Sequence, residues 1–118
     1  MNKQRQEDML IGAYEGGSNY WAELSEDALE IIKKYRKSGR APSEQMFDAI
    51  QAGESIPIED SEEGGVIGYI DKASIKRAMT IMEVDYPVDY ANIISENDDC
   101  NTADIFFQLA VMGEVVFG

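Results

Sequence analysis

The chain has 118 residues, of which 44% are hydrophobic and 28% charged, so we expect one globular domain over residues 1–118. Its 23 acidic and 10 basic residues give a net charge of −13, which disfavours direct binding to nucleic acids or anionic membranes. Histidine is absent and Cys100 is the only cysteine, which excludes Ser-His and Cys-His catalysis, His-bearing zinc sites and intrachain disulfides.

The first half of the chain predicts three helices. Lys3–Tyr14 has apolar residues partly on one face and is followed by two glycines. A second helix begins after Ser25, a suitable N-cap, runs through Lys37, and carries an apolar stripe of Ala28, Leu29, Ile32 and Tyr35. A third helix starts at Pro42, which fits a first helical position, and ends at Gly53.

The middle of the chain predicts a β-hairpin. Ser55–Ile58 and Val66–Ile70 are short and rich in β-branched residues, and the polar, glycine-bearing segment Glu59–Gly65 separates them. Proline lacks a backbone N–H for the sheet, so Pro57 indicates that the first of these strands lies at an edge.

The last third predicts three more helical segments and one strand. Ser74 is a suitable cap for a helix that carries Ile75, Ala78, Met79 and Met82, which we expect to pack on the hairpin with a shorter helix, Val88–Ile94. Asn101 or Thr102 would cap a final, strongly apolar helix ended by Gly113, and Val115–Phe117 is a candidate third strand. The fold class is therefore α+β, with five to six short helices and a small antiparallel sheet.

Acidic residues are concentrated in two regions. Residues 41–71 contain eight acidic and no basic residues, and so do residues 78–118. The densest cluster lies in the predicted hairpin loop and consists of Glu59, Asp60, Glu62 and Glu63. Such a cluster is typical of a solvated turn, and it is also the surface that a nucleic-acid mimic would present to a basic partner.

The segment after the first helix is the best candidate for a ligand-binding loop. Its glycines allow close backbone approach, its polar side chains supply hydrogen-bonding groups and its aromatic residues supply stacking faces; the residues are Gly16, Gly17, Ser18, Asn19, Tyr20 and Trp21. It lacks the lysine and the preceding strand of a phosphate-binding loop. The alternative is a turn that ends the helix, followed by aromatic residues that fill the core.

An oxygen-rich segment precedes the last helix and holds the candidate ligand-binding residues Asp98, Asp99, Thr102 and Asp104. Its spacing does not match an EF-hand, because Ala103 stands where an oxygen ligand is needed and the turn glycine is missing. Capping of the helix is the alternative interpretation. We predict no metal and no cofactor.

Two segments together resemble a known group of proteins. They are Gly16–Trp21, with the sequence GGSNYW, and residues 102–118, with the pattern TADxFxQLAxxGEVVFG. Both are similar to small uncharacterised proteins encoded by bacteriophages, prophages and other mobile elements. That resemblance brings no substrate, cofactor or catalytic residue. It implies a bacterial cytoplasmic location and favours a binder of host machinery over an enzyme.

Two main hypotheses for function follow. The first is a non-enzymatic binding protein that acts on a host protein through its acidic surface. The second is a small-ligand or nucleotide-binding domain, with or without enzymatic activity, built from Gly16–Trp21 and Asp98–Asp104. It requires the two segments to meet at one concave pocket. Self-association through the apolar C-terminal segment is a third alternative. No secretion signal is recognised in MNKQRQEDML, and we expect no membrane partner.

Overall fold

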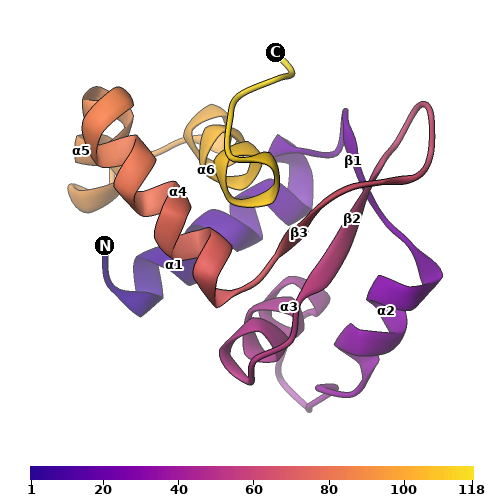
Figure 1. Ribbon diagram of the computed structural model, residues 1–118. Helices are drawn as coiled ribbons and strands as arrows, with labels where there is room; N and C mark the ends of the chain where they lie inside the picture. The colour runs from indigo at the N-terminus through magenta and orange to yellow at the C-terminus, as the bar shows by residue number, and fades with distance from the viewer.

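The computed structural model, which describes residues 1–118, contains six α-helices and a three-stranded antiparallel sheet, and α2, α4 and α6 pack against the strands (Figure 1). In chain order the elements are α1 (Lys3–Gly12), a π-helical turn (Ala13–Gly17), β1 (Ala22–Leu24), α2 (Glu26–Lys33), α3 (Pro42–Gln51), β2 (Ile56–Asp60), β3 (Val66–Ile70), α4 (Lys72–Asp85), α5 (Pro87–Ile94) and α6 (Cys100–Met112). The predicted α+β fold class is confirmed.

The sheet has the order β1-β2-β3, and β2 and β3 form the predicted hairpin. The predicted third strand, Val115–Phe117, is wrong. Ala22–Leu24 takes that place and pairs with Ile58–Asp60. The backbone N–H groups of Val116 and Phe117 instead donate to the Gln108 side chain, so the C-terminal segment is fixed to α6 and not to the sheet.

The prediction that Pro57 marks an edge strand is also wrong, because β2 is the central strand. The register explains why proline is tolerated there. β1 has only three residues and ends opposite Ile58, so Pro57 has a strand neighbour only on the β3 side, where it lies opposite Tyr69. The strand is therefore central in order but an edge at this residue.

Local sequence signals set most helix ends. Ser25 caps α2 by accepting a hydrogen bond from the N–H of Ala28. The helix ends at Lys33 and not at the predicted Lys37. The N–H groups of Lys34 and Tyr35 donate hydrogen bonds to the carbonyl oxygens three residues earlier, which tightens the last turn. Gly113 ends α6 in the left-handed conformation, with φ of 80°, as predicted.

The predicted caps of α4 and α6 are wrong by two or three residues. Asp71, and not Ser74, caps α4, and Ser74 completes the capping box by accepting a hydrogen bond from the Asp71 N–H. Asp99 caps α6 and receives bonds from the N–H and the hydroxyl of Thr102. An aspartate one turn earlier therefore takes the cap, and the predicted cap residues lie inside the first turn.

The core is built around α6, the strongly apolar final helix, and nine of its 13 residues are buried. It packs against α1, α4 and β3, while α5 packs on α4 and α6 and not on the hairpin (Figure 1). Gly68 of β3 lies directly against the backbone of Val111, and Gly12 of α1 lies against Ala103. None of the helices has the length and hydropathy needed to cross a lipid bilayer.

Candidate functional site

A buried carboxylate joins the two segments that the sequence singled out. Asp104 lies in the second turn of α6, is 5% exposed, and accepts four side-chain hydrogen bonds. One carboxylate oxygen accepts from Ser18 Oγ and from Trp21 Nε1, both at 2.7 Å. The other accepts from the Tyr20 hydroxyl at 2.5 Å and from Gln108 Nε2 at 3.0 Å. We call these five residues the Asp104 cluster.

Gln108 extends the Asp104 cluster to the C-terminal segment. Its Oε1 accepts from the backbone N–H groups of Val116 and Phe117, and its Nε2 also donates to the Phe117 carbonyl. The Phe117 ring stacks on Trp21 with ring centres 5.2 Å apart. Sequence reasoning did not select Gln108, although its position four residues after Asp104 places the two side chains on one helix face.

The Asp104 cluster holds Tyr20 at the surface in a fixed position. Trp21 is buried, whereas Tyr20 is 51% exposed, and only its hydroxyl end reaches inward to Asp104. The two candidate segments therefore do meet, but through a hydrogen-bonded cluster that fills the space between them. No residue of Asp98–Asp104 lines any of the five main cavities.

The remaining candidate residues are spread around this centre. Asp98 forms an ion pair with Arg5, and Asp99 and Thr102 share the α6 cap. Gly17 packs closely against α6, and a Cβ at this position would be 2.6 Å from the Cys100 carbonyl oxygen. A Cβ at Gly16 would have no atom within 4 Å. The exposed Asn19 lines an apolar cavity beside the loop and forms no hydrogen bond within the protein.

The hydroxyl of Tyr20 should ionise only at high pH. Burial of the hydroxyl end and the hydrogen bond to Asp104 raise the pKa of Tyr20 from 10.0 to about 12. The folded state therefore favours the neutral phenol, and this stabilisation is complete below pH 10 and disappears as the pH rises through about 12. An ultraviolet tyrosinate titration should show a step near pH 12 that Tyr20→Phe removes and the exposed-site control Tyr69→Phe retains. Loss of that step in the control would contradict the assignment.

The hairpin loop is anchored beside Tyr20. The Ser61 N–H donates to the Trp21 carbonyl at 2.8 Å, and Ser61 Oγ donates to the Tyr20 carbonyl. Asp60 accepts from the backbone N–H groups of Glu63 and Glu62, and these bonds hold the pKa of its carboxyl below the usual value. Tyr20, Trp21, Asp60 and Glu62 line a shared groove of about 280 Å³.

The acidic side chains of this region have no ionic partner. Glu59 lies opposite Glu23 across the β1–β2 pair, so two like charges share one face of the sheet. The ion pairs of the protein lie elsewhere and use Arg5, Lys34 and Arg40. We define the hairpin-end surface as Tyr20, Glu23, Glu59, Asp60, Glu62 and Glu63.

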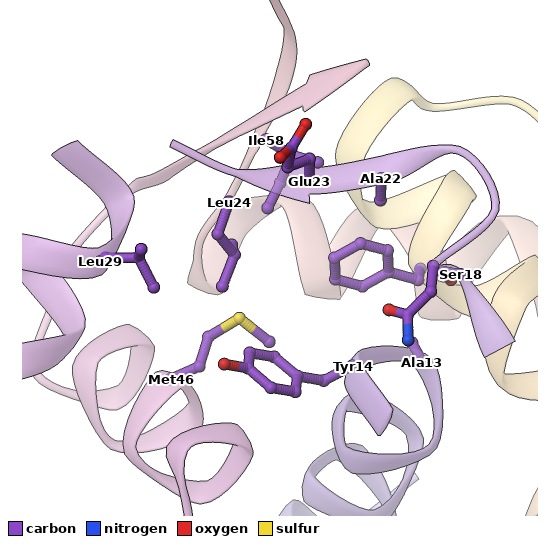
Figure 2. A pocket seen from close by; sticks show the side chains of 11 residues that line it. Ala13, Tyr14, Ser18, Ala22, Glu23, Leu24, Leu29, Met46 and Ile58 are labelled. Carbon is purple, nitrogen blue, oxygen red and sulfur yellow. The ribbon is translucent and has the colours of Figure 1, made fainter. Parts of the chain in front are cut away.

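A second hollow lies beside the segment Gly16–Trp21 (Figure 2). This cavity has a volume of about 330 Å³ and is lined mainly by apolar side chains from the π-helical turn, β1, α2, α3, β2 and α6. No group of three or more Cys, Asp or Glu side chains is arranged to hold a metal ion.

Comparison of the chain with protein-family models, with curated proteins and with solved structures finds no match in any of the three.

Proposed function

We propose that this protein is a non-enzymatic binding protein that docks onto a basic region of a bacterial host protein through its hairpin-end surface. The observation that carries the proposal is the combination of carboxylates that form no ion pair and the exposed ring of Tyr20, whose hydroxyl is held by the buried Asp104. Carboxylates and aromatic faces are the groups that bind lysine and arginine side chains.

The electrostatics of the hairpin-end surface support this proposal. Glu23 and Glu59 repel each other across the sheet, and no lysine or arginine of the chain pairs with either. A cationic partner would relieve that repulsion on binding. The net charge of −13 would also steer a basic partner toward the protein, which raises the association rate more than it raises the affinity.

The fixed position of Tyr20 supports the same conclusion. A side chain that loses mobility on binding costs about 0.5–1.5 kcal/mol. The hydrogen bond from Tyr20 to Asp104 already removes that mobility in the free protein. Tyrosine is also enriched among the residues that dominate protein interfaces. Where the partner's basic region normally holds nucleic acid, the carboxylates would act as phosphate mimics.

The proposal is tested by reversing charge at one end of the molecule at a time. Glu62→Lys combined with Glu63→Lys changes two exposed side chains whose carboxylates form no bonds within the protein. Immobilised wild-type protein and this variant are used to capture proteins from a bacterial lysate, and the captured protein is then purified. We expect the captured protein to associate with the double variant about tenfold or more slowly than with the wild-type protein at low salt.

The matched control is Glu83→Lys combined with Asp85→Lys, which makes the same change of charge on α4. These residues are exposed, form no ion pair, and lie near α5, at the opposite end of the molecule from the hairpin loop (Figure 1). The control should retain rapid association. An equal loss of association rate in both double variants would show that only the total charge of the protein matters. Equal capture by the wild type and both double variants would refute docking through the hairpin-end surface. Competition by duplex DNA for the captured partner tests mimicry separately.

A further inference from the structure

The cavity beside Asn19 has the dimensions and lining of a small-molecule site. Its volume of about 330 Å³ lies at the lower end of the range found for ligand pockets. The buried side chains of Ala13, Met46, Ile58 and Phe107 form its inner wall. In Figure 2, Leu24, Leu29, Met46 and Tyr14 point from three sides into the same space.

Leu29 indicates that this space is not ordinary core. The amphipathic stripe of α2 predicts a buried residue at this position, and the neighbouring Ala28 and Ile32 are buried. Leu29 is nevertheless 41% exposed and lines the mouth of the cavity. A ligand in the cavity would cover this side chain and so complete the apolar stripe of the helix.

The polar groups at the cavity narrow the class of ligand. The Tyr14 hydroxyl and the Asn19 amide line it and form no hydrogen bond within the protein. The adjacent Glu15 contributes, after burial, to a raised pKa of the Tyr14 phenol, whereas the carboxylate of Glu23 points away from the cavity (Figure 2). No lysine or arginine lines the cavity. The nearby Glu15 and the absence of a basic side chain therefore disfavour an anionic ligand, and the two unpaired polar groups favour a ligand that donates a hydrogen bond.

We propose that this cavity, which we call the Tyr14 pocket, binds a small aromatic amine, uncharged or cationic. Rings would pack between the Met46 thioether and the Tyr14 and Phe107 rings, which favour aromatic neighbours. The amine would donate to the side-chain oxygen of Asn19. Nucleotides and fatty acids carry a negative charge, and the cavity has no lysine or arginine to balance it.

Two dyes with the same ring system provide the probe. N-phenyl-1-naphthylamine is uncharged, whereas 8-anilinonaphthalene-1-sulfonate carries an additional sulfonate. Each is titrated into the protein, with fluorescence and amide NMR shifts as readouts. We expect saturable binding of the uncharged dye, shifts centred on Leu24 and Leu29, and at least tenfold weaker binding of the sulfonate. Absence of saturable binding, equal affinity for both dyes, or shifts centred elsewhere would each overturn the proposal.

Variants assign the binding to the Tyr14 pocket. Leu29→Trp should fill the mouth and abolish binding of the uncharged dye, and Val88→Trp, at a 73% exposed position on α5, should retain it. Asn19→Ala changes an exposed side chain without filling space and should weaken binding severalfold, so the test holds even if Leu29→Trp fails to fold. Unchanged binding in Asn19→Ala would refute the polar contact. Glu62→Lys with Glu63→Lys should bind the dye normally, which separates this proposal from the proposed partner surface.

Discussion

Asp104→Ala is expected to destabilise the protein by about 3–5 kcal/mol, a large part of the total stability of an ordinary domain. The change removes the acceptor of four hydrogen bonds, and the Ser18 hydroxyl and Trp21 Nε1 would be left unpaired inside the protein. Each buried donor without a partner costs about 1–3 kcal/mol. Urea unfolding followed by far-ultraviolet circular dichroism measures the loss.

Asp104→Asn separates the hydrogen bonds from the charge. Asparagine retains one oxygen for Ser18 and Trp21, but its NH₂ group would face the NH₂ group of Gln108. We expect Asp104→Asn to destabilise the protein by about half as much as Asp104→Ala. Asp89→Asn on α5, whose carboxylate forms no bond within the protein, is the matched control and should leave the free energy of unfolding within about 0.5 kcal/mol of wild type. A near-neutral Asp104→Ala would mean that the Asp104 cluster does not support the fold.

Gly68→Ala is expected to cost about 3 kcal/mol or more, or to prevent folding. A Cβ at this position would overlap the Val111 carbonyl oxygen, and it would also be 2.7 Å from Val111 Cγ1. The side-chain overlap can relax, but the backbone overlap can be relieved only by moving β3 away from α6. Thermal and urea unfolding measure the effect.

Two further variants identify the cause of that loss. Gly16→Ala adds the same methyl group where no atom lies within 4 Å, and it should cost much less. Adding Val111→Ala to Gly68→Ala removes the side-chain overlap but not the carbonyl, so the double variant should recover little stability. Full recovery would show that the Val111 side chain, and not backbone contact, makes glycine necessary.

Local chemistry explains the elements that were predicted correctly. Ser25, Pro42 and Gly113 act on the backbone next to them, so their effect on a helix end is visible in the sequence. The hairpin has β-branched strands and a polar loop that are close in sequence. The caps of α4 and α6 were misplaced because several nearby residues can accept the same N–H bonds, and only the geometry of the turn selects Asp71 and Asp99.

The missed features depend on distant contacts. β1 has three residues, too few for an alternating pattern, and it is a strand because β2 offers Ile58–Asp60 as a partner. Both candidate segments of the site were chosen for their oxygen-rich or aromatic side chains. Their convergence on one carboxylate results from the packing of α6 against α1 and the turn after it. No local pattern contains that information.

The position of α6 in the chain has a consequence for the order of folding. The contacts of Asp104 with the loop after α1 join residues 83 to 86 positions apart, and most of the core packs on this last helix. Contacts of high sequence separation slow folding, because a long loop must close before they contribute. On the ribosome, α1, β1 and the hairpin therefore emerge without their central partner. The domain completes its core only after α6 has been synthesised, and truncated chains that lack α6 expose the apolar surface on which α6 packs to chaperones and proteases.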